Sequence, residues 1–184
     1  MRLIKTQHTI FVATIVFLFG CDFRQGKRAE AKIESKSESV VTGQAFFSEK
    51  KGKVKLEINL TGAEPGPTAV HLHSIGDCSS EDATSSGGHW NPTKEKHGKW
   101  GETQFHSGDI GNISLDASGK GVLILIDQHD RWSIGGPAET NVIGRAVVVH
   151  QGRDDMVSQP SGAAGKRTGC GLIIETTGVT KKRN

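Results

Sequence analysis

Six of the eight histidines, together with a nearby aspartate, have the residue types and spacing of a metal centre. The six are His71, His73, His89, His97, His106 and His150. The first two are two residues apart in a segment expected to be a strand, so their rings should project from one face. Three more follow in a polar segment that ends near Asp109, and the last ends another apolar run. Imidazole suits copper and zinc, and one carboxylate among histidines suits zinc.

The elements that must position these side chains have the pattern of β-strands. Val54, Leu56, Ile58 and Leu60 alternate with polar residues, which is typical of a half-buried strand. Further strand candidates are 40–47, 70–73, 113–115, 122–126, 146–150 and 172–175. No long segment has helical spacing, and the chain contains 24 glycines. These features predict an antiparallel sandwich or barrel.

Two long segments, 75–108 and 151–169, interrupt the strand pattern and are polar and rich in glycine. Loops of this length inside a compact domain are usually functional or disordered. They contain or border most of the candidate ligands, so we expect both to build the site. His129 lies in a different loop, around 127–136, and is interpreted as a surface histidine.

The N-terminal end reads as an export signal. A basic start precedes an apolar run of ten residues, Ile10–Phe19, which is too short to span a bilayer as a helix. The next residues resemble the lipobox of bacterial lipoproteins, which would place a lipid on Cys21. Cleavage by an ordinary signal peptidase, or a buried cysteine, are the alternatives. We expect a signal peptide at 1–20, a flexible charged tether at 21–39, one domain at 40–178 and a basic tail at 179–184.

The charge balance and the cysteine count indicate which partners and which cellular compartment to expect. The formal net charge is +3, with 23 basic and 20 acidic side chains, and no basic stripe is interleaved with aromatic residues. Nucleic acid is therefore not an expected partner. Apart from Cys21 the chain has only Cys78 and Cys170, and a pair of cysteines in an exported domain predicts a disulfide. The expected location is the periplasm or cell envelope, with a lipid anchor to a membrane.

The order of these motifs resembles the copper/zinc superoxide dismutases, in particular the bacterial periplasmic branch. The matching segments are 71–73, 76–78, 88–92, 97–98, 106–109, 144–150 and 165–171. The resemblance implies an all-β fold, an eight-stranded antiparallel Greek-key β-barrel or sandwich (immunoglobulin-like) with two long functional loops. It implies one copper and one zinc ion per subunit and superoxide as the substrate. A homodimer is one possible assembly.

The same resemblance assigns roles to individual residues. Copper would be held by His71, His73, His89 and His150. Zinc would be held by His89, His97, His106 and Asp109. His89 would bridge the two metals and carry a proton during catalysis. Asp154 would link a copper ligand to a zinc ligand, and Arg167 would attract the superoxide anion beside the copper.

The activity expected from the resemblance is conversion of two superoxide anions to oxygen and hydrogen peroxide by cycling Cu(II) and Cu(I), which would protect the cell envelope. The alternative is a non-catalytic periplasmic lipoprotein that binds copper and zinc. The presence of all seven ligands and of Arg167 favours the enzyme. A third hypothesis, an adhesin that uses the barrel as a scaffold, has no large aromatic or repetitive surface to support it.

Overall fold

The computed structural model describes residues 26–176 as a barrel of antiparallel strands. The strands are β1 (Arg28–Ser35), β2 (Thr42–Lys50), β3 (Lys53–Thr61), β4 (Gly66–His73), β5 (Gly111–Leu115), β6 (Lys120–Ile126), β7 (Ala146–His150), β8 (Arg167–Leu172) and β9 (Ile174–Glu175). A single 3₁₀ turn, Thr84–Ser86, is the only helical element of the described residues. No helix among them is long and apolar enough to cross a membrane.

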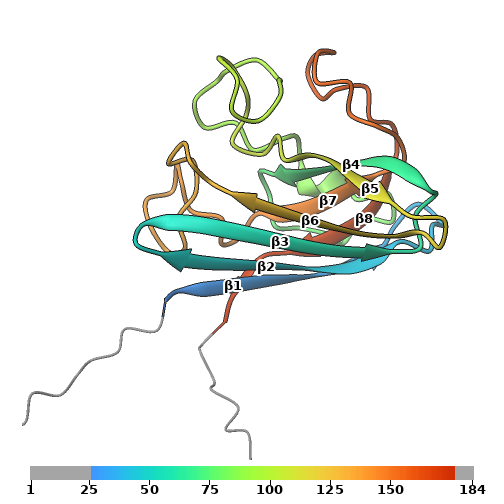
Figure 1. The fold of residues 1–184 in the computed structure, drawn as a ribbon, viewed down its shortest axis with the longest axis horizontal. Coiled ribbons are helices and arrows are strands. Elements are labelled where there is room, and N and C mark those ends of the chain that lie inside the picture. Colours follow the sequence, from blue (N-terminus) through green and yellow to red (C-terminus); the bar gives the residue numbers. More distant parts are fainter. Residues whose placement is uncertain (1–25, 177–184) are drawn as a thin grey trace, which may run out of the picture.

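The strand order is that of a Greek key. Eight strands follow one path, β5-β4-β7-β8-β1-β2-β3-β6, and the short β9 pairs with β1. The chain crosses the barrel between β3 and β4 and again between β6 and β7, so strands that are distant in sequence become neighbours (Figure 1). No ladder joins β5 to β6, although Gly121 on β6 lies close to the carbonyl oxygen of Ser114 on β5. The predicted fold class, an eight-stranded antiparallel barrel, is confirmed as a nearly closed barrel.

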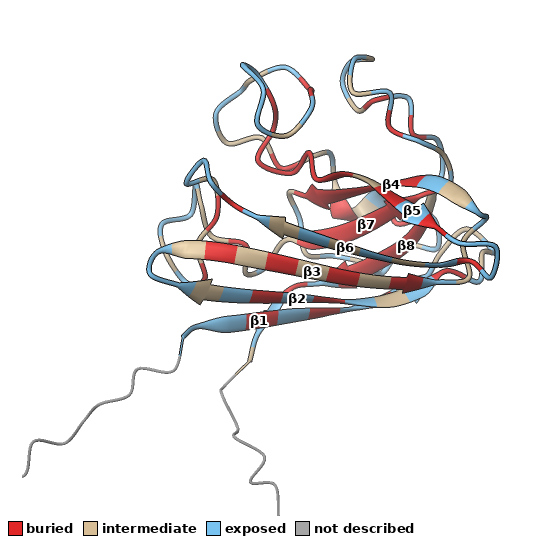
Figure 2. Ribbon diagram, viewed as in Figure 1, coloured by how far each residue is buried: buried red, intermediate tan, exposed pale blue. Residues whose placement is uncertain are grey.

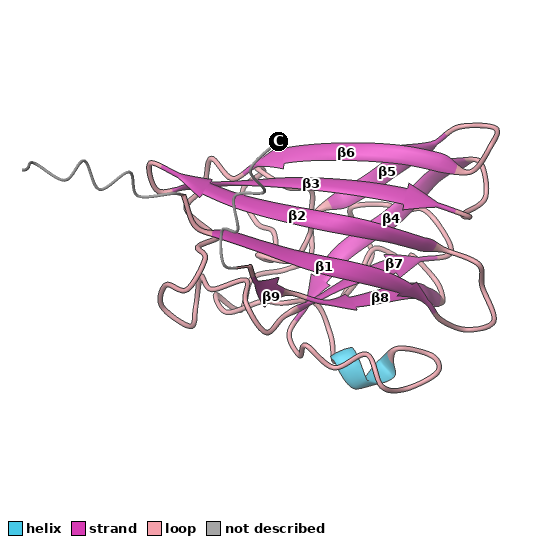
Figure 3. Ribbon diagram, turned by 90° about the horizontal axis from the view of Figure 1, so that it is seen from below, coloured by secondary structure: helices cyan, strands magenta, loops and turns pink. Residues whose placement is uncertain are grey.

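The core lies between two layers of strands. Viewed from below, β1, β2, β3 and β6 form one layer in front of β4, β5, β7 and β8 (Figure 3). Val54, Leu56, Ile58 and Leu60 of β3 are buried in this core, as their alternation predicts. On β4 the same role falls to Val70 and Leu72. Because side chains on a strand alternate between its faces, His71 and His73 project to the outer face of the barrel.

That outer face is covered rather than solvated. Every residue of β7 is buried, whereas the residues of β3 alternate between buried and half-buried (Figure 2). The cover consists of the two long loops, 74–110 and 151–166, which rise from the same side of the barrel (Figure 1). A disulfide between Cys78 and Cys170 fastens the first loop to β8, as expected from the cysteine count. The candidate metal ligands therefore lie between the sheet and the two long loops that cover it.

Two expectations about the chain need correction. Residues 28–35 are a strand in the middle of the sheet, so the flexible tether predicted for 21–39 is wrong over this stretch, and the domain begins before residue 40. The inward positions of β1 are Ala29, Ala31 and Ile33, all buried. Two of the three are alanines, whose small side chains give a weak apolar signal between charged neighbours. The second loop also ends earlier than predicted, because Arg167 begins β8.

Candidate metal centre

Two groups of donor atoms lie on the outer face of β4 and β7, each within 4.8 Å of one another. The first, which we call the all-histidine cluster, consists of His71, His73, His89 and His150. The second, which we call the histidine–aspartate cluster, consists of His89, His97, His106 and Asp109. The structure thus brings together all six histidines and the aspartate that the sequence singled out. His89 belongs to both clusters.

The barrel itself positions the all-histidine cluster. His71 and His73 are neighbours on one face of β4, and β4 pairs with β7, which ends at His150. His89 is brought to them by the first loop, which forms an isolated β-bridge with His73. The backbone on either side is fixed too, because Leu72 receives a hydrogen bond from Trp90 N at 2.8 Å and donates one to Gly108 O at 2.9 Å. The ring centroids of His71 and His89 are 4.0 Å apart.

Each histidine except the shared His89 has one ring nitrogen bonded to an acceptor outside the donor sets. Those of His73, His106 and His150 donate to the carbonyl oxygens of Gly87 at 2.8 Å, Glu95 at 3.0 Å and Gly165 at 3.3 Å. His71 Nε2 and His97 Nε2 donate to the two oxygens of Asp154, at 2.8 and 2.9 Å. Such partners fix the orientation of each ring and leave the other nitrogen to bind an ion.

Asp154 therefore joins the two clusters through hydrogen bonds from one histidine of each. It is fully buried, and its own backbone is held by Asn112. Gly162 lies against it with φ at +71°, and a Cβ there would collide with Asp154 Oδ1 and approach His97 Nε2 to 2.7 Å. A glycine is thus required at this point of the second loop. Nothing in the sequence around Gly162 distinguishes it from the other glycines.

The remaining nitrogens are buried and have no hydrogen-bond partner among the described residues. They are His71 Nδ1, His73 Nε2, His89 Nε2, His97 Nδ1, His106 Nδ1 and His150 Nε2. A buried polar atom without a partner is costly, and six of them in one place indicate that a ligand completes the site. The free nitrogens of His71, His73, His89 and His150 belong to the all-histidine cluster. Four imidazoles with free nitrogens fit copper.

The histidine–aspartate cluster fits zinc. The Nδ1 atoms of His89, His97 and His106 lie 2.8, 3.0 and 3.2 Å from Asp109 Oδ1. Donor atoms on a tetrahedron with zinc–nitrogen distances of about 2.0–2.1 Å would be separated by roughly 3.3 Å. Asp109 Oδ2 accepts hydrogen bonds from the backbone nitrogens of Gly98, at 3.0 Å, and His106, at 2.8 Å. One carboxylate oxygen thus organises the loop while the other faces the ring nitrogens.

Burial and nearby charges shift the pKa of histidines in the two clusters in different directions. Burial lowers the pKa of His73 to about 2, of His150 to about 3 and of His89 to about 4, with mutual histidine repulsion contributing. Burial also disfavours a charge on His97, but contacts with Asp109 and Asp154 outweigh it and raise its pKa to about 9. Burial would raise the pKa of both aspartates, yet their histidine partners hold each pKa well below its usual value.

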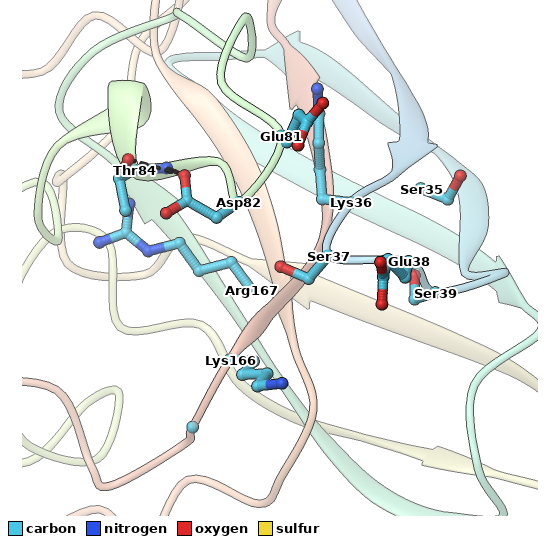
Figure 4. Close-up of a pocket in the computed structure, with 11 residues that line it drawn as sticks. Ser35, Lys36, Ser37, Glu38, Ser39, Glu81, Asp82, Thr84, Lys166 and Arg167 are labelled. Carbon is cyan, nitrogen blue, oxygen red and sulfur yellow. Dashed lines mark hydrogen bonds between the residues drawn. The ribbon is translucent and has the colours of Figure 1, made fainter.

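A pocket of about 490 Å³ opens onto the clusters and has Arg167 in its wall. His73, His89, His106 and His150 line it as well. Arg167 Nη1 donates to Ala83 O at 2.8 Å and to Ser86 Oγ at 3.1 Å. Arg167 also lines a second pocket of about 870 Å³, where its side chain reaches toward Asp82 and Thr84 (Figure 4). The arrangement can attract a small anion to the all-histidine cluster.

Several functional contacts were not foreseen from the sequence. The carbonyl oxygens of Gly87, Glu95 and Gly165 carry no side-chain signal at all. Glu95 is itself held by Arg131, whose Nη2 lies 2.7 Å from Glu95 Oε2, and the Arg131 guanidinium packs 4.6 Å from the centre of the Phe105 ring. His129 joins this aromatic group beside Trp100 and Phe105 instead of either cluster.

Comparisons with known proteins agree with this geometry. The family described as copper/zinc superoxide dismutase matches residues 41–173. Superoxide dismutase [Cu-Zn] 2 of Aquifex aeolicus is 33% identical over 167 residues, covering 88% of this chain and 95% of that protein. Superoxide dismutase [Cu-Zn] 3 of Arabidopsis thaliana is 34% identical over 134 residues, covering 70% of this chain and 79% of that protein.

Two further similarities are to proteins with other names. The copper chaperone for superoxide dismutase of Rattus norvegicus is 35% identical over 131 residues, which is 67% of this chain but only 44% of the chaperone. The chain thus spans less than half the length of that relative. The crystal structure of the clock protein EA4 superposes with a TM-score of 0.70 and 35% identity, covering 82% of this chain and 96% of that one.

Proposed function

The chain belongs to the copper/zinc superoxide dismutase family, and we propose that it converts two superoxide anions and two protons to oxygen and hydrogen peroxide. One observation carries the proposal. Two donor clusters share His89, and the pocket that reaches them has Arg167 in its wall. A site that only stored metal would have no need of a cation beside an open path for an anion.

We propose that His71, His73, His89 and His150 hold copper and that His89, His97, His106 and Asp109 hold zinc. Copper would supply the one-electron chemistry by alternating between Cu(II) and Cu(I), while zinc, which has no redox chemistry, would fix the loop and tune His89. The unpartnered nitrogens of the first set and the carboxylate of the second support this division.

His89 is proposed to hold and return the proton that the reaction needs. Its Nδ1 is 2.8 Å from Asp109 Oδ1, while its Nε2 faces the all-histidine cluster without a partner. A proton taken up at Nε2 would lie within the pocket that superoxide enters. With Nδ1 bound to zinc, the ring that carries this proton would be a neutral imidazole, and the charge of the bound cation would make the proton easier to give up.

Arg167 is proposed to bring superoxide to the metal. The substrate is a small anion, and a guanidinium in a pocket wall raises its local concentration. Burial lowers the pKa of Arg167 from its ordinary value, and the charge of Asp82 opposes that change. Lys96, an exposed lysine that lines the same pocket, adds a second positive charge. Attraction by such charges weakens with salt because ions screen it.

We further propose an exported protein of the bacterial cell envelope or periplasm, anchored by a lipid on Cys21. The apolar run Ile10–Phe19 and the lipobox-like residues that follow it support this proposal. Both lie outside the described residues. A homodimer is proposed as one assembly; family membership is its only support. Mass measurement of the mature N-terminus tests lipidation, and an unmodified mass starting after Cys21 would refute it.

The test of the enzymatic proposal is superoxide consumption by protein loaded with copper and zinc. The protein must include β1, because a chain starting at residue 40 would lack a strand from the middle of the sheet. We expect a fast second-order reaction that slows as ionic strength rises, and a slower, less salt-dependent reaction in Arg167→Gln. Full metal loading without superoxide consumption would contradict dismutation.

That negative outcome would favour the second candidate, a copper- and zinc-binding protein without catalysis. The similarity to a copper chaperone is the observation that supports it. Transfer of copper from the loaded protein to a copper-free acceptor, followed by the visible spectrum of each partner, separates delivery from simple binding.

A further inference from the structure

Ser86 is a fully buried serine whose hydroxyl lies near both His73, a proposed copper ligand, and Arg167. It ends the 3₁₀ turn Thr84–Ser86, within the loop that runs from the disulfide to His89. A hydroxyl removed from water must be satisfied by the protein. Its partners therefore indicate what it does.

The hydroxyl has one hydrogen to donate and two lone pairs that accept. Ser86 Oγ donates to Ala83 O at 2.7 Å. The remaining contact with Arg167 Nη1, at 3.1 Å, must then be one in which the serine accepts. His73 Nδ1, which donates to Gly87 O at 2.8 Å, is also 3.4 Å from Ser86 Oγ. The same oxygen thus contacts the guanidinium and a candidate copper ligand.

The guanidinium of Arg167 is fixed by two acceptors on one side. Nη1 carries two N–H groups, and its acceptors are Ala83 O and Ser86 Oγ. No hydrogen bond to Nε or Nη2 is found among the described residues. Those groups remain for an anion. A single hydrogen bond would leave the planar guanidinium free to rotate about that bond. Two hydrogen bonds fix the orientation of its plane.

Ala83 depends on the same hydroxyl. Its backbone has a left-handed conformation, φ +57°, although it is a buried non-glycine residue packed with Cys78 and Cys170. Its carbonyl oxygen accepts hydrogen bonds from both Ser86 Oγ and Arg167 Nη1. Ser86 therefore acts on Arg167 twice, once directly and once through the carbonyl that holds it.

We propose that Ser86 is a positioning residue, which orients Arg167 so that its free N–H groups face the all-histidine cluster and set the affinity for the incoming anion. The proposal deepens the dismutase function and rests on it for the identity of the anion. The geometry of the two hydrogen bonds is independent of the reaction.

The test replaces the hydroxyl and measures anion affinity as well as rate. In the copper- and zinc-loaded protein, Ser86→Ala should raise the dissociation constant of azide, followed by its effect on the Cu(II) absorption spectrum, about three- to tenfold, the size of one net hydrogen bond. The rate constant for superoxide should fall by a similar factor, with metal content unchanged. Alanine is smaller than serine, and the Ala83 carbonyl keeps Arg167 Nη1 and Ser86 N as donors, so the variant should fold.

Ser85→Ala is the matched control. Ser85 lies in the same loop and is hydrogen-bonded to Ser80 and Asp77, but no hydrogen bond joins it to Arg167 among the described residues. It should leave azide affinity within twofold. An equal effect of the two variants would mean that loosening of the loop explains the change, and it would overturn the proposal.

A double variant separates positioning from other causes. If Ser86 acts through Arg167, adding Ser86→Ala to Arg167→Gln should change azide affinity no further. An undiminished effect in that background would also overturn the proposal. Should the parent protein fail to consume superoxide while Ser86→Ala still weakens azide binding, the dismutase function would be refuted and the positioning role retained.

Discussion

The two donor clusters share one histidine but are built in different ways. Three of the four members of the all-histidine cluster lie on β4 and β7, so the paired strands of the barrel hold them. All four members of the histidine–aspartate cluster come from one loop. That loop is held by side chains from elsewhere, including Asp154, Gln159 and Arg131. A strand-built site is preformed, whereas a loop-built site depends on its contacts.

Their charges differ in the same way. The all-histidine cluster contains no carboxylate, and burial lowers the pKa of His73, His89 and His150, which disfavours a charge on these three rings. The histidine–aspartate cluster has a buried carboxylate, and the raised pKa of His97 means that a proton balances part of that charge. The comparison teaches that zinc must displace a proton from His97 to bind, whereas the copper ligands of lowered pKa have no such proton to release. Four predictions test this contrast.

The largest effect is expected from Asp109→Asn. The carboxylate is the only anionic ligand of its cluster, and its second oxygen accepts from Gly98 N and His106 N. Zinc affinity should fall by more than the 10- to 100-fold that loss of an outer-shell partner costs. Competition with a chromophoric chelator measures it. Asp155→Asn, at an exposed carboxylate of the second loop that is bonded to Ser158, is the control. Zinc affinity within threefold of the parent would contradict the assignment.

Asp154→Asn should weaken both sites, by about 10- to 100-fold each. Its two oxygens accept from His71 Nε2 and His97 Nε2, and an amide offers only one acceptor oxygen. Separate titrations with Cu(II) and Zn(II) measure the two losses. If only one metal is affected, Asp154 serves that cluster alone and the link between the clusters is refuted.

Acidification should release zinc well before copper. Because the pKa of His97 is raised to about 9, zinc must displace a proton at any lower pH, and its apparent affinity should fall up to about tenfold per pH unit as the pH falls. The same raised pKa stabilises the metal-free fold fully below pH 6.5 and loses that effect as the pH rises through about 9. Copper affinity should depend less on pH over the same range, because three of its ligands, His73, His89 and His150, have a pKa of about 4 or lower.

Calorimetry in two buffers of different ionisation enthalpy measures the protons released at pH 7.5. With each metal added alone to metal-free protein, so that His89 keeps a proton on its other nitrogen, we expect roughly one proton for zinc and fewer for copper. Equal proton release by the two metals would remove the electrostatic contrast between the clusters.

The smallest effect is expected from Arg131→Ala. The Arg131–Glu95 pair is half-buried, and the Glu95 carbonyl accepts from His106 Nε2 at 3.0 Å. Partly exposed ion pairs contribute up to about 1 kcal/mol, so zinc affinity should fall no more than about fivefold and copper affinity should not change. Arg131→Lys, which keeps the charge, should recover part of the loss. A change in copper affinity alone would contradict the role of this loop contact.

The ligands could be predicted from the sequence because histidine spacing and strand alternation are local patterns. His71 and His73 on one strand face are an example. The chain also signals β3 clearly, through four large apolar residues in alternation. By contrast β1 has only Ala29, Ala31 and Ile33 on its inner face, so its burial depends on strands that are distant in sequence.

The supports of the site were harder to foresee because they are long-range contacts. Gln159 accepts from His97 N across 62 residues, and Arg167 reaches Ala83 across 84. Many of the acceptors are backbone carbonyls, which every residue possesses. Only the three-dimensional arrangement selects Gly87, Glu95 and Gly165 from all the others.

The early start of β1 has a consequence for where the protein could work. Arg28 already belongs to the sheet, so only residues 22–27 separate Cys21 from the barrel. Six residues reach at most about 20 Å when fully extended. A lipid on Cys21 would therefore keep the barrel within about its own diameter of the bilayer. Such a protein would react with superoxide close to the membrane surface and not with superoxide farther from it.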